Sequence, residues 1–227
     1  YGDHRDLHLS IRRQRQMCIR DRHGDNYNEA ALHAKHLCES EGLIYIPPYD
    51  DVDVIAGQGT IGMEIINQHS RPLDAIFIPV GGGGLIAGVA AYVKYLHPKT
   101  KIIGVEAEGS NCLDAAMKAG RRVSLPIEKL DLFADGVSVA QIGKETFKIA
   151  KRYVDDVVVV SVDEICAAIK DVFEDTRSIL EPAGALSIAG MKKDIFESKY
   201  TNKNMIAIAC GANMNFERLR FLSLIHI

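Results

Sequence analysis

The sequence lacks long apolar runs, and its five cysteines follow no metal-binding or disulfide pattern. No stretch reaches the roughly 18 apolar residues that a transmembrane helix requires, so we expect no membrane-spanning segment. The cysteines are odd in number, scattered and never spaced as Cys-x-x-Cys, which argues against a disulfide framework or a zinc site. Together these absences favour a reducing, cytoplasmic setting. The cysteines are Cys18, Cys38, Cys112, Cys166 and Cys210.

A strong charge imbalance is also missing. The net charge is only -3, so we expect neither a nucleic acid nor an anionic membrane as a partner. The 227 residues, of which 47% are hydrophobic, suffice for one α/β domain or two small ones.

The two ends of the chain differ from its middle. Residues 1–22 contain six Arg and three Asp but no Ala, Val, Pro or Phe, and their apolar residues fit neither a helical nor a strand period. A basic N-terminal arm is one interpretation. We favour another, because RRQRQMCIRDR and the final SLIHI resemble translated sequencing adapter more than any protein family. We therefore interpret residues 1–22 as a non-native leader and residues 223–227 as a non-native tail.

Between these ends, helical and strand patterns alternate. Such alternation predicts an α/β fold in which a parallel sheet is covered by helices on both faces. Thr60 is the predicted start of the second helix, and residues 120–143 read as a long loop. Helices are predicted over 28–37, 60–68, 85–96, 111–119, 144–152, 163–179 and 184–197, and strands over 43–46, 75–80, 101–106, 154–162 and 205–209.

The segment PVGGGGLIAG places four consecutive glycines, residues 81–84, between a predicted strand and a predicted helix. Free N–H groups and the helix dipole favour an anion at such a helix start. Because glycine has no Cβ, several successive N–H groups can approach the oxygens of one phosphate. No lysine follows in a Gly-Lys-Ser/Thr pattern, so a nucleotide-triphosphate P-loop is excluded. A tight turn with close packing is the alternative without a ligand.

A dinucleotide site is the main competing hypothesis. Gly82, Gly84 and Ala87 fit the loose Gly-x-Gly-x-x-Gly/Ala fingerprint, and Glu106 ends the next strand near the distance expected for a ribose contact. That fingerprint is weak alone, normally follows the first strand of its domain, and leaves Gly81 and Gly83 unexplained. A single phosphate accounts for all four glycines.

Seven segments in order along the chain resemble the biosynthetic threonine dehydratases, or threonine ammonia-lyases, of the fold-type II (tryptophan synthase β-like) pyridoxal-phosphate enzymes. The resemblance implies that residues 23–222 are a partial catalytic domain. It also implies a pyridoxal 5'-phosphate cofactor and elimination of water from threonine (or serine), giving 2-oxobutanoate (or pyruvate) and ammonia in isoleucine biosynthesis. The segments are HGDNYNEA (23–30), DVIAGQGTIGMEI (53–65), PVGGGGLIAGVA (79–90), GVEAEGSN (104–111), LFADGVSV (132–139), ILEPAGALSIAG (179–190) and ACGANMNFERLRF (209–221).

The resemblance also assigns cofactor-binding residues. Cys210 would face the pyridine nitrogen, and Gly136 would line the cofactor's edge. From the residues alone, Cys210 reads as a small buried hydrophobe, and Gly136 reads as a loop glycine with positive φ. Glu181 precedes a proline at a predicted helix start and receives no role. The residues that would cradle the phosphate are Gly81, Gly82, Gly83, Gly84 and the N–H of Leu85.

The family's catalytic lysine is missing from this sequence. Schiff-base chemistry needs an amine, which the family supplies in a Ser-x-Lys-x-Arg motif, and no lysine here stands in that setting. The family's Ser-Gly-Asn-His substrate loop is absent too. We therefore expect this chain to be inactive by itself, and we assign it no catalytic residue. His33 and His36 lie three residues apart without a third ligand, so no metal site is predicted.

Two alternatives to threonine dehydratase stay open. One is another fold-type II enzyme, such as a serine racemase or serine dehydratase. The other is a protein that binds a phosphate cofactor without catalysis. For the full-length enzyme, the resemblance implies a homo-oligomer, either a dimer or a tetramer, acting on a small amino acid.

Overall fold

The computed structural model describes residues 23–24, 27–197 and 202–214. The chain divides into two compact units, residues 1–46 and residues 47–227. The predictions for residues 1–22 and 223–227 lie outside the described residues. None of the described helices is long and apolar enough to cross a membrane.

The first unit contains helix α2 (Tyr27–Glu41), close to the prediction over 28–37. Gly42 follows it with φ +69°, and the imidazole of His23 stacks on that of His33 at 3.7 Å between ring centroids. The predicted strand over 43–46 is wrong, because these residues form no strand and Ile44 is 90% exposed. A short apolar segment becomes a strand only when a neighbouring strand accepts its hydrogen bonds.

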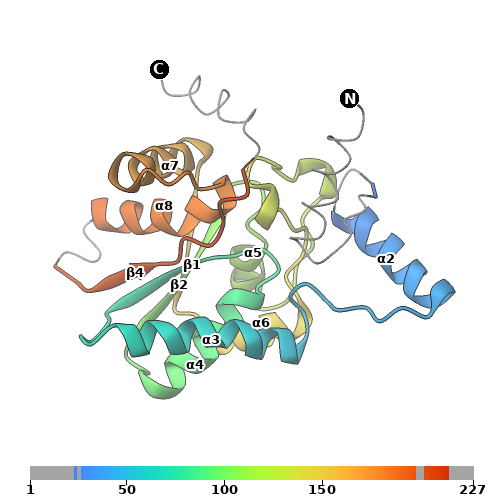
Figure 1. Cartoon of the computed structure of the whole chain (residues 1–227), viewed down its shortest axis with the longest axis horizontal. Coiled ribbons are helices and arrows are strands. Elements are labelled where there is room, and N and C mark those ends of the chain that lie inside the picture. Colours follow the sequence, from blue (N-terminus) through green and yellow to red (C-terminus); the bar gives the residue numbers. More distant parts are fainter. Residues whose placement is uncertain (1–22, 25–26, 198–201, 215–227) are drawn as a thin grey trace, which may run out of the picture. The chain divides into compact units, whose positions relative to one another are not determined.

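The second unit is built on one parallel sheet of four strands in the order β3-β2-β1-β4 (Figure 1). In the register of this sheet, Phe77 of β1 lies beside Ile103 of β2 and Ala207 of β4. The carboxyl ends of β1 and β4 therefore meet at the same edge of the sheet. The strands are β1 (Ala75–Pro79), β2 (Lys101–Ala107), β3 (Asp156–Val160) and β4 (Met205–Ala207).

Helices connect these strands at nearly the predicted positions. The loop predicted over 120–143 contains two short 3-10 turns, η1 (Ile127–Lys129) and η2 (Asp135–Val137). The helices are α3 (Val52–Gln68), α4 (Gly84–Leu96), α5 (Cys112–Ala119), α6 (Lys144–Tyr153), α7 (Val162–Thr176) and α8 (Pro182–Phe196).

Helix α3 begins eight residues before the predicted start at Thr60. Asp51 caps it, accepting hydrogen bonds from the N–H groups of Asp53 at 2.9 Å and Val54 at 3.2 Å. The predicted start at Thr60 is wrong, because the glycines of the GQG segment do not interrupt the helix. Instead, Gly59 packs against α4, where a Cβ on Gly59 would lie 3.3 Å from the carbonyl oxygen of Gly88.

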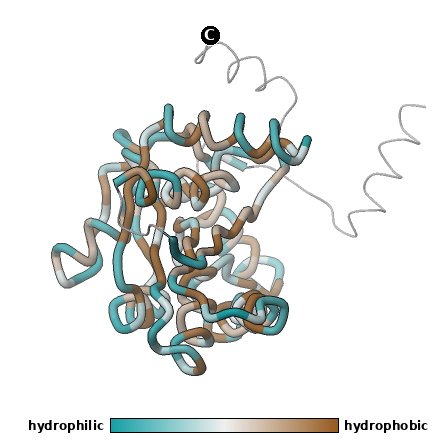
Figure 2. The backbone as a smooth tube through the Cα atoms, turned by 90° about the vertical axis from the view of Figure 1, so that its left-hand side faces the viewer, coloured by the Kyte–Doolittle hydropathy of each residue, from teal (hydrophilic) through white to brown (hydrophobic). Residues whose placement is uncertain are grey.

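The hydrophobic core forms two clusters, one on each face of the sheet. Phe77 of β1 belongs to the cluster under α7 and α8, whereas its neighbours Ile76 and Ile78 belong to the cluster with α4, α5 and α6. This division follows from the alternation of side chains along a strand. In Figure 2, hydrophobic and hydrophilic residues alternate along the helical turns, as expected for helices with one buried face. The predicted parallel α/β fold with helices on both faces is confirmed.

Candidate functional site: the glycine loop at the end of β1

The glycine loop, residues 81–84, lies at the carboxyl end of β1 and leads directly into α4. Gly83 has φ +92°, a left-handed conformation that favours glycine, and it occupies the N-cap position of α4. Parallel α/β sheets bind ligands beyond the carboxyl ends of their strands. The loop therefore lies where the sequence pattern predicts a ligand site.

The carbonyl groups of the first two glycines are held by the protein. The Gly81 carbonyl accepts a hydrogen bond from the Cys112 thiol at 3.6 Å. The Gly82 carbonyl accepts two, from the Thr146 hydroxyl at 2.8 Å and from the Gly143 N–H at 3.2 Å. These donors belong to the starts of α5 and α6, so two helices fix the loop.

The N–H groups of the loop differ from its carbonyl groups in having no partner among the described residues. Within the part of the chain that the structure describes, the N–H groups of residues 81–85 donate no hydrogen bond. In a planar trans peptide the carbonyl of one residue and the N–H of the next point in opposite directions. Holding the carbonyls of Gly81 and Gly82 against the protein thus turns the N–H groups of Gly82 and Gly83 to the other side. Free donors at a helix start fit a phosphate.

Close packing also requires small residues in this loop. A Cβ on Gly82 would lie 2.3 Å from the Tyr49 ring, and one on Gly84 would lie 3.1 Å from Tyr49 Cβ. A Cβ on Gly81 would lie 3.0 Å from the Val137 Cα. The alternative of a tight turn with close packing therefore describes part of this loop correctly. Packing and phosphate binding are compatible, because packing uses the Cα atoms and leaves the N–H groups unpaired.

Gly136 lies in the turn η2, on a segment that contacts the glycine loop through Val137. A Cβ on Gly136 would lie 3.0 Å from the Cβ of Ala183 and 3.5 Å from Glu181 Oε1. Gly136 is not among the glycines with positive φ, so that explanation of it is wrong. The close approach of α8 explains it instead.

Cys210 follows the last strand, β4, at the same edge of the sheet as the glycine loop. The residue is exposed rather than buried, which contradicts the interpretation as a buried hydrophobe, and its sulfur lies 4.0 Å from the Ala183 carbonyl. Displacement of water by the surrounding protein, and then the nearby Glu181 carboxylate, raise the pKa of the Cys210 thiol. The thiol is therefore neutral near pH 7.

Glu181 joins these segments, although the sequence analysis assigns it no role. Its N–H donates to the Gly211 carbonyl at 3.1 Å, and its Oε2 accepts a hydrogen bond from the Asn213 N–H at 3.1 Å. A Cβ on Gly211 would lie 2.2 Å from Glu181 Oε1. Glu181 thus fixes the segment after Cys210, and its position before Pro182 at the start of α8 was the available sequence indication.

Glu106 cannot make the ribose contact that a dinucleotide site requires. Its side chain is completely buried, and its two oxygens accept hydrogen bonds from the N–H groups of Leu113 and Asp114 at 2.8 Å each. Burial is the main cause that raises the pKa of Glu106 to about 8. The carboxyl group serves the start of α5, which removes the chief support for a dinucleotide site.

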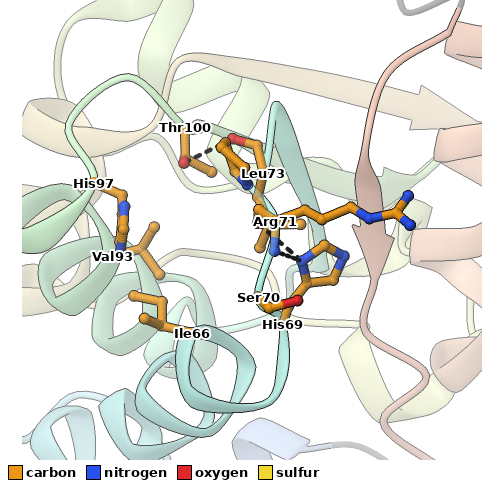
Figure 3. A pocket seen from close by; sticks show the side chains of 9 residues that line it. Ile66, His69, Ser70, Arg71, Leu73, Val93, His97 and Thr100 are labelled. Carbon is orange, nitrogen blue, oxygen red and sulfur yellow. Dashed lines mark hydrogen bonds between the residues drawn. The ribbon is translucent and has the colours of Figure 1, made fainter.

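A separate pocket of about 350 Å³ lies at the opposite edge of the sheet (Figure 3). It is lined by residues that precede β1, such as His69 and Leu73, and by residues around the end of α4, such as His97. His69 Nδ1 lies 2.9 Å from the Arg71 carbonyl oxygen and 3.2 Å from the Arg71 nitrogen. Figure 3 shows Arg71 extending away from Val93 and His97. No sequence pattern indicates this pocket.

Comparison with known proteins identifies the family. The pyridoxal-phosphate dependent enzyme family matches residues 10–211. The chain is 52% identical over 200 residues to the L-threonine dehydratase biosynthetic IlvA of Burkholderia multivorans, covering 88% of this chain and 39% of that protein. It is 53% identical over 200 residues to the chloroplastic biosynthetic threonine dehydratase of Arabidopsis thaliana, covering 88% of this chain and 33% of that protein.

The fold agrees with these similarities. The processed form of threonine deaminase isoform 2 from Solanum lycopersicum superposes with a TM-score of 0.85 at 48% identity, covering 90% of this chain and 59% of that structure. This chain thus spans well under half the length of those two curated relatives. With the unpaired N–H groups of the glycine loop, whose donor chemistry fits the cofactor's phosphate, these similarities show that the chain belongs to the pyridoxal-phosphate-dependent enzyme family.

Proposed function

We propose that this chain is the cofactor-binding part of a threonine dehydratase, which converts L-threonine to 2-oxobutanoate and ammonia. Water is eliminated from the amino acid, and hydrolysis of the resulting imine takes up one water and releases the ammonia. The glycine loop, with its carbonyls fixed and its N–H groups unpaired, is the observation that carries the proposal. The identity of 52–53% to threonine dehydratases supports threonine over the alternative of a serine racemase or dehydratase.

The phosphate of pyridoxal 5'-phosphate would be held by the N–H groups of the glycine loop, residues 81–84, and of Leu85. The helix dipole of α4 would add to the favourable interaction with the phosphate charge. Gly136 would lie along one edge of the cofactor. When bound, the cofactor supplies an electron sink for the electrons of the Cα–H bond that breaks.

Cys210 would face the pyridine nitrogen. Because the pKa of its thiol is raised, Cys210 keeps its own proton near pH 7 and offers no negative charge to that nitrogen. A neutral partner leaves the pyridine nitrogen unprotonated, so the ring is a weaker electron sink suited to β-elimination. Glu181 would hold the residues that follow Cys210 through its hydrogen bond from the Asn213 N–H.

Isothermal titration calorimetry of this chain with pyridoxal 5'-phosphate tests the proposal. We expect saturable binding, and we expect Gly83→Ala to weaken it about tenfold or more, because alanine is strained at φ +92°. Gly120→Ala is the matched control, since Gly120 has φ +67° with nothing within 4 Å of an added Cβ. Equal binding by both variants, or no binding by the unaltered chain, would contradict a cofactor site in the glycine loop.

We also propose that this chain binds the cofactor without a covalent bond and is inactive by itself. The proposal rests on the missing Ser-x-Lys-x-Arg motif. Borohydride reduction with one equivalent of cofactor, followed by mass spectrometry, should show no lysine adduct in stoichiometric yield. A single fully modified lysine, or formation of 2-oxobutanoate from L-threonine, would overturn it.

For the full-length enzyme we propose a dimer or tetramer in the cytoplasm, with a small amino acid as substrate. Support comes from the family resemblance and from the scattered cysteines. The Arabidopsis relative is chloroplastic, so fractionation of the source cells is the direct test of location. Light scattering of the purified full-length enzyme tests the oligomeric state.

A further inference from the structure

Two consecutive aspartates cap two different helices. Asp51 caps α3, the helix that follows it directly, through two N–H groups. Asp50 caps α6, which lies more than ninety residues further along the chain. Its Oδ2 accepts from the Lys144 N–H at 2.8 Å, and its Oδ1 accepts from the N–H groups of Glu145 at 2.8 Å and Thr146 at 3.2 Å.

Helix α6 depends on this distant cap. Its own N-cap residue, Gly143, has no side chain to offer its first N–H groups. A Cβ on Gly143 would lie 2.4 Å from Asp50 Oδ1, so only glycine leaves room for the carboxylate. One side chain therefore satisfies three of the four N–H groups that a helix start leaves unpaired.

The capped turn of α6 is the same turn that holds the glycine loop. The completely buried Thr146 donates its hydroxyl to the Gly82 carbonyl at 2.8 Å, and the Gly143 N–H donates to the same oxygen at 3.2 Å. Tyr49, the residue before Asp50, places its ring against Gly82. The turn of residues 49–50 thus acts on Gly82 directly through Tyr49 and indirectly through α6.

We propose that Asp50 is a positioning residue for phosphate binding, an inference that rests on the proposed function of the glycine loop. By fixing the first turn of α6, Asp50 fixes the direction of the Gly82 carbonyl. The peptide plane then sets the direction of the Gly83 N–H, which points the opposite way and belongs to the phosphate donors. Asp50 has no contact with the cofactor in this arrangement and acts only through Thr146 and Gly143.

The test compares Asp50→Ala with Asp51→Ala in this chain, using pyridoxal 5'-phosphate and pyridoxal as two ligands. Each variant loses one helix cap, so we expect each to lower the Tm by about 2–4 °C. Only Asp50→Ala should weaken binding of the phosphorylated ligand, by about tenfold, while binding of pyridoxal stays unchanged. Asp50→Asn, which keeps one acceptor oxygen, should recover part of the affinity.

Thr146→Val is the second variant, in case Asp50→Ala does not fold. It keeps the volume of the side chain and removes the hydroxyl that holds Gly82, so it too should weaken binding of the phosphorylated ligand alone. If Asp50→Ala and Thr146→Val bind pyridoxal 5'-phosphate as Asp51→Ala does, the positioning role is wrong while the proposed function stands. If the unaltered chain binds no cofactor, the proposed function fails, and the positioning role fails with it.

Discussion

Two glycine-rich regions of this chain use glycine for different physical reasons. Where α3 crosses α4, Gly59 and Gly88 let two helix backbones touch, and the N–H groups there belong to helical hydrogen bonds. In the glycine loop, residues 81–84, the carbonyls are held and the N–H groups donate nothing within the described part of the chain. Close packing occurs in both regions. Of these two regions, only the loop has unpaired donors among the described residues, as the proposed phosphate site requires.

The largest expected effect is the loss of stability from a substitution at the crossing of α3 and α4. A Cβ on Gly88 would lie 2.3 Å from the Ile55 carbonyl oxygen and 2.6 Å from the Gly59 nitrogen, both backbone atoms. We expect Gly88→Ala to lower the free energy of unfolding by about 3 kcal/mol, measured by chemical denaturation. Gly57→Ala is the matched control.

Gly57 lies on the exposed side of α3, and nothing is within 4 Å of an added Cβ. Alanine there should raise the free energy of unfolding by up to about 1 kcal/mol, because alanine favours a helix more than glycine does. A Gly88→Ala variant as stable as the unaltered chain would show that α3 and α4 can separate without cost.

The next effect is the pH dependence of stability caused by Glu106, the buried carboxyl group that accepts hydrogen bonds at the start of α5. The pKa of Glu106 is raised to about 8 in the folded chain from an ordinary value of 4.5. Below pH 4.5 both folded and unfolded chains hold this proton, whereas between 4.5 and 8 only the folded chain holds it. Glu106 therefore makes stability fall as pH rises through this window, by up to about 1.4 kcal/mol per pH unit.

Glu106→Gln should remove that pH dependence, because the amide does not titrate. Denaturation from pH 5 to pH 8 measures the slope for each variant. Glu164→Gln is the matched control, because it also removes a carboxylate that accepts a hydrogen bond at a helix start. Glu164 accepts from the Ser161 N–H at the start of α7. An unchanged slope in Glu106→Gln would mean that another group carries the pH dependence.

The smallest expected effect comes from removing the Cys112 thiol, which donates to the Gly81 carbonyl. Cys112→Ala removes the hydrogen bond to the Gly81 carbonyl, and it should weaken binding of pyridoxal 5'-phosphate by about threefold. Cys166→Ala removes a similarly buried thiol from α7, so it should cost similar stability without changing this affinity. Equal affinities of the two variants would assign Cys112 to packing alone.

Much of the fold could be predicted from local patterns. The apolar run over 75–80 predicted β1, because a strand buried on both faces needs apolar residues throughout. The start of α3 and the supposed strand over 43–46 could not be predicted this way. Asp51 and Thr60 are both residue types that can cap a helix, and whether Leu43 to Ile46 pair depends on a partner strand.

For the candidate site, the sequence by itself determined the glycine loop, its place between a strand and a helix, and its suitability for a phosphate. Glycine is the residue that permits φ +92° and close approach, so four in a row between a strand and a helix indicate such a loop. Only the tertiary structure decided how the loop is held. Asp50 reaches α6, Glu106 turns inward to α5, and Glu181 joins the Cys210 segment. The contacts of Asp50 and Glu181 join residues that are 94 and 32 positions apart, and such hydrogen bonds exist only after the fold has brought those segments together.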